Sequence, residues 1–87
     1  EKVPKTTKLL KLKIDTGIDI RTIVSGIAEY FEPQSLIGQQ ISIVANLEPR
    51  KIRGIESKGM ILMAEDRNGK LVLVSPAEKV TNGSMIK

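Results

Sequence analysis

The sequence predicts a small all-β domain built as a barrel of short strands, and three observations lead to this prediction. Aliphatic and β-branched residues are frequent while aromatic residues make up only 2% of the chain, a composition that favours strands over helices. Short segments with a period of two recur along the chain, separated by turns that contain glycine. The chain has 87 residues, which suits one domain with one core, so we expect residues 1–87 to form a single domain.

The first half of the chain predicts a hairpin. Apolar and charged residues alternate over residues 8–15, the pattern of a half-buried strand. Asp15-Thr16-Gly17 is a turn signal, and residues 18–24 alternate again. One face of the first strand carries Leu10, Leu12 and Ile14, and one face of the second carries Ile18, Ile20, Thr22 and Val24. Upstream, Glu1-Lys2-Val3 has the pattern of a strand's tail, and we expect most of that first strand to lie outside this chain.

The second half predicts further strands at residues 40–45, 60–65 and 71–74, with a short terminal strand at residues 85–87. A short helical turn is expected from Pro33, which suits a first helical position, to Gly38. Asn68-Gly69 predicts a type I′ hairpin turn. Residues 46–59 are too basic and too often broken by glycine for a strand or an amphipathic helix, so they are expected to form a loop. This order of elements best matches the five-stranded oligonucleotide/oligosaccharide-binding (OB) barrel, with an SH3-like barrel as the main alternative.

The strands at residues 60–65 and 71–74 are apolar on both faces. Continuous apolar strands need cover on both sides, and so short a chain has little material for a second layer. We therefore expect a homodimer formed through these strands, which Leu73→Asp should disrupt. The alternative is that the C-terminal segment folds back over them.

Composition excludes several classes of function. The chain has no cysteine and no histidine, which removes disulfides, thiolate metal sites, the usual zinc ligand and the usual general base. No apolar run approaches the ~20 residues that span a bilayer, and no signal peptide is apparent. A soluble cytoplasmic domain without cofactor, metal or membrane contact is therefore expected.

The basic residues predict a polyanionic partner. The formal net charge is +4, which suits such a partner without requiring one. The cations gather in an N-terminal group, which includes Lys5 and Lys8, and in the loop that holds Arg50, Lys51, Arg53 and Lys58. Such cations can contact phosphates, although Glu48 and Glu56 also fit an ordinary solvated loop. Scarce aromatic residues argue against single-strand binding by base stacking, so structured RNA is the better expectation.

Two carboxylate pairs, Asp15 with Asp19 and Glu65 with Asp66, are the candidates for catalytic groups. Each pair flanks a predicted hairpin turn, where acidic residues are common for local reasons. No nucleophile–base pair and no glycine-rich phosphate loop accompany them. We expect no catalytic site in this chain.

Three segments, read together, resemble one family: Arg21-Thr22-Ile23-Val24-Ser25-Gly26-Ile27-Ala28, Val44-Ala45-Asn46-Leu47, and Gly54-Ile55-Glu56-Ser57-Lys58-Gly59-Met60-Ile61-Leu62. The chain is similar to the tRNA-binding domain found at the C-terminus of bacterial methionyl-tRNA synthetases, in free-standing dimeric tRNA-binding proteins and in the endothelial-monocyte-activating polypeptide group. Its C-terminal residues are most similar to the synthetase version.

The resemblance implies an OB-fold barrel, a homodimer formed through a C-terminal extension, and binding of tRNA by shape rather than by sequence. It places the family's Ser-x-Gly-Met motif on Ser57, Gly59 and Met60, and two further RNA-binding positions on Lys8 and Asn46. Met60 fits a core position as well as an RNA contact, and Ser57 fits a serine that bonds local backbone. With the loop cations, the expected RNA-binding residues are Lys8, Asn46, Arg50, Lys51, Arg53, Ser57, Lys58, Gly59 and Met60.

The resemblance also implies an appendage that brings tRNA to a synthetase catalytic domain in the same parent chain. A free-standing tRNA-binding protein, or a chaperone-like protein-interaction dimer of the same fold, is the alternative. The start of the chain departs from the family pattern, because Val3-Pro4-Lys5-Thr6-Thr7 replaces a longer first strand and its following segment.

Overall fold

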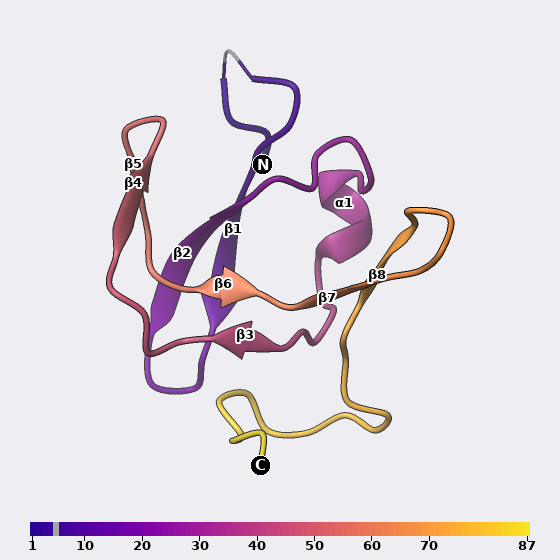
Figure 1. Ribbon diagram of the computed structural model, residues 1–87. Coiled ribbons are helices and arrows are strands. Elements are labelled where there is room, and N and C mark those ends of the chain that lie inside the picture. Colours follow the sequence, from indigo (N-terminus) through magenta and orange to yellow (C-terminus); the bar gives the residue numbers. More distant parts are fainter. Residues whose placement is uncertain (5) are drawn as a thin grey trace.

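The computed structural model describes residues 1–4 and 6–87, so Lys5 of the predicted N-terminal cluster lies outside the described residues. The elements, in chain order, are β1 (Leu10–Asp15), β2 (Ile20–Ser25), α1 (Pro33–Leu36), β3 (Ile43–Val44), β4 (Arg50–Ile52), β5 (Ile55–Ser57), β6 (Met60–Ile61), β7 (Met63–Glu65) and β8 (Leu71–Leu73) (Figure 1). In the described part of the chain α1 is the sole helix, and it has four residues. The all-β prediction is confirmed.

The predicted first hairpin is present. β1 and β2 pair antiparallel, with Leu10 opposite Ser25 at one end and Asp15 opposite Ile20 at the other. The predicted strand tail also pairs with β1, since Lys2 forms a bridge with Leu10. Extended residues on both sides of β1 therefore anchor the N-terminal part of the fold.

The core lies under one end of this hairpin. Leu10 and Ile23 are fully buried, and Val24 is nearly so. Successive strand residues point to opposite faces, so β2 is covered on both sides at Ile23 and Val24. The face of the second strand that was predicted to carry Ile18, Ile20, Thr22 and Val24 is buried only at Val24. At its other end, by the turn, Ile18 is 91% exposed.

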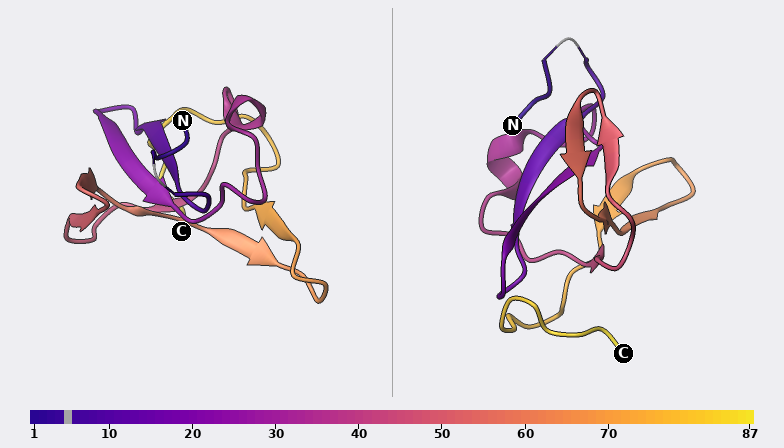
Figure 2. Two further views of the ribbon diagram at one scale, coloured as in Figure 1. Left: turned by 90° about the horizontal axis from the view of Figure 1, so that it is seen from above. Right: turned by 90° about the vertical axis from the view of Figure 1, so that its left-hand side faces the viewer.

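β3 and β6 form a second ladder, with Ile43 opposite Ile61. The single strand expected over residues 60–65 is interrupted at Leu62, whose amide donates to the Ser42 carbonyl at 2.9 Å. The Ser42 amide in turn donates to the Val74 carbonyl at 3.0 Å. β7 then leaves this ladder and pairs with β8, and the β7–β8 hairpin projects from the body (Figure 2).

The prediction of a loop over residues 46–59 is wrong for residues 50–57, although residues 46–49 and 58–59 belong to no strand. β4 and β5 form an antiparallel hairpin that reaches away from the body on the side opposite β7 and β8 (Figure 1). Arg53 and Gly54 have φ of 53° and 78°, and positive φ at both central residues defines the type I′ hairpin turn. Arginine seldom takes this conformation, so the turn was not apparent from the residue types. We call residues 50–57 the basic arm.

The β7–β8 hairpin is confirmed, but its predicted turn type is wrong. Among described non-glycine residues only Arg53 has positive φ, so Asn68 does not take the type I′ conformation. Instead the Gly69 amide donates to the Asp66 carbonyl at 3.1 Å, and the Asp66 carboxylate accepts from the Asn68 amide at 2.9 Å. Aspartate at the first position favours this ordinary turn.

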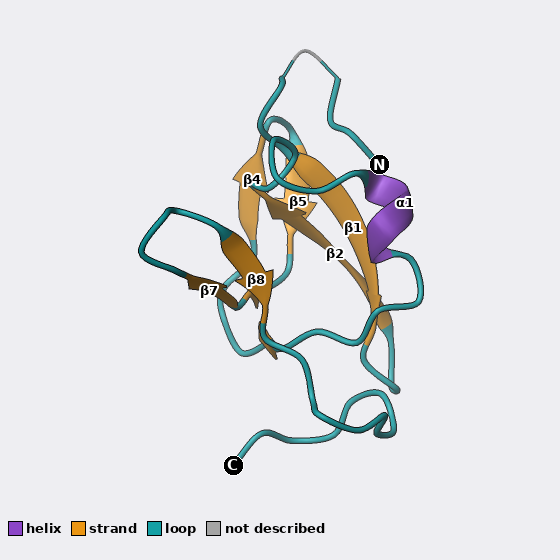
Figure 3. Cartoon of the chain, turned by 90° about the vertical axis from the view of Figure 1, so that its right-hand side faces the viewer, coloured by secondary structure: helices purple, strands orange, loops and turns teal. Residues whose placement is uncertain are grey.

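The predicted terminal strand over residues 85–87 is also absent, because these residues are exposed and belong to no strand. The C-terminal segment instead turns back beneath the body (Figure 3). The Gln40 side chain holds it, accepting from the Val80 amide at 3.0 Å and donating to the Asn82 side chain at 3.0 Å. Val72 and Val74 stay 46% and 40% exposed, so the segment does not cover β8.

An apolar groove of about 1130 Å³ lies between β1 and residues 36–42, which lead into β3, and residues of the C-terminal segment also line it. In residues 1–4 and 6–87, no backbone hydrogen bond joins the two sides of this groove. The strands of the described residues pair as four two-stranded ladders, which is consistent with an OB-like fold, and full closure of the barrel stays a prediction.

Candidate nucleic-acid interface

The basic arm presents three cations on a two-stranded hairpin. Arg50, Lys51 and Arg53 are exposed, and no ion pair of the described residues includes any of them. Arg50 lies opposite Ser57 in the hairpin, and Lys51 lies opposite Glu56. Successive residues of a strand point to opposite faces, so Arg50 and Lys51 lie on different faces of the arm and Arg53 lies at its tip. The arm therefore offers positive charge on both faces and at its end, where phosphates of one nucleic acid can approach it.

Residues 57–59 fasten the arm to β2. The Ser57 hydroxyl accepts the Val24 amide proton at 2.9 Å, and the Lys58 amide donates to the Thr22 carbonyl at 2.8 Å. Ser57 is only 4% exposed. The structure therefore places this predicted site residue beneath the surface, bonded to backbone as a structural serine would be.

Gly59 completes the attachment. Its φ is 140°, and a Cβ at this position would lie 2.9 Å from the Val44 carbonyl oxygen and 3.2 Å from Cδ1 of Ile23. A larger residue would force β6 away from β3 at this point. Lys58 and Met60, on either side of Gly59, are exposed, Met60 by 52%. Met60 therefore belongs to the surface of this chain rather than to its core.

The remaining two predicted residues, Asn46 and Lys8, are also exposed, but they lie near opposite ends of the first hairpin. Asn46 follows Ala45, whose carbonyl oxygen contacts Arg21 near the Asp15 end of the first hairpin. Lys8 precedes the opposite end, where its carbonyl accepts from the Ala28 amide at 3.0 Å. Asn46, Lys58 and Met60 thus form one group at the base of the arm, and Lys8 stands apart from it.

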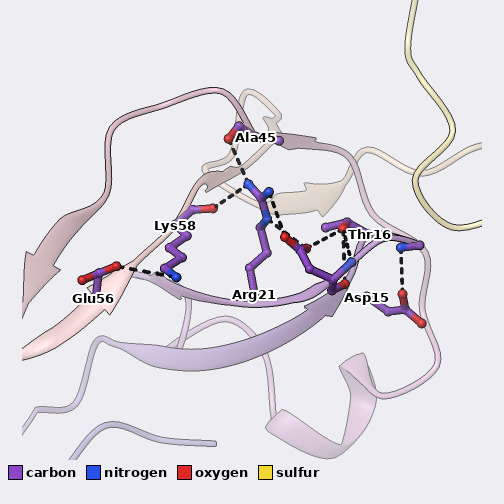
Figure 4. Close-up of polar contacts among 8 residues, drawn as sticks. Asp15, Thr16, Arg21, Ala45, Glu56 and Lys58 are labelled. Atoms are coloured by element: carbon purple, nitrogen blue, oxygen red, sulfur yellow. Dashed lines mark hydrogen bonds and ion pairs between the residues drawn. The ribbon is translucent and has the colours of Figure 1, made fainter.

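Arg21 links the segments of this group (Figure 4). Its Nη1 donates to the carbonyl oxygens of Ala45 at 3.0 Å and Lys58 at 3.4 Å. Its Nε and Nη2 donate to the two carboxylate oxygens of Asp19 at 3.3 and 3.2 Å. Sequence reasoning assigned Arg21 no role. The sequence did contain a signal that could have pointed to Arg21: it is an arginine on a predicted strand, two residues after Asp19 and between two β-branched residues.

A shallow groove of about 350 Å³ runs between the first hairpin and the arm. It is lined by Lys11, Ile20, Arg21, Thr22, Ile55, Glu56 and Lys58. The Lys58 ammonium lies 3.7 Å from the Glu56 carboxylate, an exposed pair of the kind that contributes little to stability. Lys58 can therefore exchange this partner for a phosphate at small cost.

Three of the four carboxylates that flank the two hairpin turns, those of Asp15, Asp19 and Asp66, have local partners. Asp15 accepts the Gly17 amide proton at 2.8 Å, and Asp66 accepts from its own turn. The Arg21 guanidinium, and after it the Thr16 hydroxyl at 2.6 Å, hold the pKa of Asp19 below its ordinary value. These contacts confirm the predicted local role at both turns.

The described residues contain no cluster of three or more metal-ligating side chains. They also contain no helix with the length and apolar character that crossing a membrane requires.

Comparison with known proteins gives a consistent result. The family model described as "Putative tRNA binding domain" matches residues 1–85. A methionine–tRNA ligase of Cytophaga hutchinsonii is 66% identical over 86 residues, which cover 99% of this chain but only 12% of that protein.

Solved structures agree with the sequence comparison. A MetRS-related protein from Pyrococcus horikoshii superposes with a TM-score of 0.92 at 42% identity, covering all of this chain and 80% of the other. The chaperone CsaA of Bacillus anthracis superposes with a TM-score of 0.83 at 31% identity, covering 91% of this chain and 76% of the other.

Proposed function

The chain belongs to the tRNA-binding domain family, and from this membership we propose that it is a non-catalytic module that binds folded tRNA by charge and shape. The observation that carries the proposal is the basic arm, with its exposed cations Arg50, Lys51 and Arg53. Each is free of the ion pairs found among the described residues. Cations free to pair with phosphates supply most sequence-independent affinity for nucleic acids.

The proposed RNA surface extends from the arm to the group at its base. Asn46, Lys58 and Met60 are exposed there and can reach a ribose, a phosphate and a base, respectively. Ser57 and Gly59 act in this proposal by holding that group in place, because one is buried and the other is closely packed. Lys8 would contact a separate part of the tRNA.

We further propose that the module is the tRNA-binding appendage of a cytoplasmic methionyl-tRNA synthetase. The support is the 66% identity to a methionine–tRNA ligase that is about eight times as long. An appendage of this kind raises the effective concentration of tRNA near a catalytic domain without performing chemistry itself.

Homodimerisation through the β7–β8 region is the last part of the proposal. Leu62, Val72 and Val74 are exposed on this hairpin and its flanks, and a contiguous apolar surface favours a partner. Val72 is a sharper probe of the interface than Leu73, because Leu73 is half-buried within its own chain.

A titration of unmodified bulk tRNA at two salt concentrations tests the function directly. The proposal predicts saturable binding that weakens as salt rises, by about 0.7–0.9 in log–log slope for each phosphate contact. A double-stranded DNA of similar length should bind more weakly, because DNA offers neither the folded tRNA shape nor the 2′-hydroxyl. Affinity that ignores salt, or no affinity, would refute the proposal.

A chaperone-like dimer that binds other proteins is the second candidate. Two observations favour it: the likeness to the chaperone CsaA of Bacillus anthracis and the apolar groove beside β1. The two candidates differ in the surface that they need. If the chain suppresses aggregation of an unfolded protein equally well with and without saturating tRNA, the chaperone-like activity uses a surface other than the arm, such as the groove.

A further inference from the structure

We propose that Arg21 is a positioning residue for the RNA surface: its guanidinium sets the spacing between the segment that carries Asn46 and the segment that carries Lys58 and Met60. This inference rests on the proposed tRNA-binding function. Arg21 stands in one of the segments that carry the family resemblance, but the resemblance gave it no role, and the role proposed here follows from its contacts.

The guanidinium joins three chain segments that are distant in sequence. Nη1 bonds the carbonyl oxygen of Ala45, the residue before Asn46, and that of Lys58. Arginine presents its donors in a planar, rigid fork, so the two carbonyls are held at a fixed separation. Among the described residues, Arg21 is the one side chain whose hydrogen bonds reach both segments.

Asp19 fixes the direction of this fork. Its two carboxylate oxygens accept hydrogen bonds from Nε and Nη2 of Arg21. This bidentate pairing restricts rotation of the guanidinium. The Thr16 hydroxyl donates to the same carboxylate at 2.6 Å. Nη1 is left facing the two carbonyl oxygens, as Figure 4 shows.

The same bonds keep Arg21 from serving as a free phosphate ligand. Its side chain is 21% exposed, and its charge already faces Asp19 at 3.2 Å. Lys58 and the cations of the arm, by contrast, are exposed. Arg21 therefore acts through the residues that it aligns.

Lysine at position 21 separates positioning from charge. Arg21→Lys keeps the positive charge but replaces the planar fork with one flexible ammonium, which cannot hold both carbonyls and the carboxylate together. Arg21→Gln removes the charge and the fork. A phosphate contact would tolerate the first change and not the second, whereas a positioning role predicts a loss for both.

The test measures tRNA affinity for the native chain, both Arg21 variants and the matched control Arg67→Gln, whose residue is exposed at the β7–β8 turn. We expect both Arg21 variants to bind about tenfold more weakly, by analogy with the loss of hydrogen bonds to a charged group, with the native salt slope. The control should bind with nearly native affinity. Circular dichroism at the assay temperature confirms that each variant is folded.

Amide hydrogen exchange on the free chain gives a readout that does not depend on RNA. Loss of the brace should speed exchange at the Lys58 amide, which donates to the Thr22 carbonyl, while the Thr16 and Val24 amides keep their own partners. Native affinity in Arg21→Lys would overturn the inference, as would a salt slope reduced by one contact in Arg21→Gln. If the native chain itself does not bind tRNA, the proposed function fails first, and the RNA role of Arg21 fails with it.

Discussion

Replacing Arg50, Lys51 and Arg53 together with alanine should weaken tRNA binding and flatten its salt dependence. All three side chains are exposed on the basic arm, so each substitution should change the free energy of unfolding by less than about 0.5 kcal/mol. If each contacts one phosphate, their loss lowers the log–log salt slope by about 2–2.7. The advantage of the native chain over the variant should then shrink about 16- to 40-fold between about 50 and 200 mM salt.

Fluorescence anisotropy with labelled tRNA measures these slopes. The matched control replaces Lys13, Arg67 and Lys79, which are exposed and lie off the arm, and removes the same charge from the native +4. An equal loss of slope in the control would mean that net charge rather than the arm drives binding. An unchanged slope in the arm variant would refute the phosphate contacts themselves.

Three further predictions concern the supporting structure. Val72→Asp should convert the proposed dimer into a monomer in sedimentation, because it places a charge on an exposed apolar strand; a variant that still sediments as a dimer excludes this interface. Gly59→Ala should lower the free energy of unfolding, measured by denaturant titration, by about 1–3 kcal/mol, because the methyl group would lie 2.9 Å from the Val44 carbonyl oxygen. Gly26 has open space around it, so Gly26→Ala should be neutral in the same titration. The pKa of the Asp19 carboxyl, measured in an NMR pH series, should lie below its ordinary value, because the guanidinium partner lowers it. The stabilisation that this pairing contributes is complete above about pH 4 and fades as the pH falls through the folded-state pKa. An ordinary pKa would mean that the pairing does not persist in solution.

Strand alternation was sufficient to predict the first hairpin and the all-β class. Alternation of apolar and polar residues with a period of two indicates a strand with one buried face, and in β1 this alternation is uninterrupted. The pattern did not predict where burial stops along β2, because this depends on which strands lie across it. Ile18 therefore looked like a core residue and is exposed.

The basic arm escaped prediction because its turn depends on an unusual residue. Arg53 takes positive φ beside Gly54, and the short strands on either side carry mostly polar residues. The more typical Asn68-Gly69 pair instead forms an ordinary turn, since the Asp66 side chain bonds the following amides. A local side-chain bond therefore decided the second case, and an unusual backbone conformation decided the first.

The roles of Arg21 and Ser57 follow from contacts between distant segments. The motif that contains Ser57 was visible in the sequence, but its hydroxyl bonds Val24, 33 residues away. Arg21 likewise reaches Ala45 and Lys58. No periodicity or spacing encodes such pairings.

Amide shift mapping of the isotopically labelled chain during a tRNA titration tests the central claim most directly. The account predicts that the largest changes cluster on the basic arm, at Asn46 and at residues 58–60, with small changes on β7 and β8. Changes concentrated on β7, β8 or the apolar groove beside β1, with the arm unaffected, would contradict it.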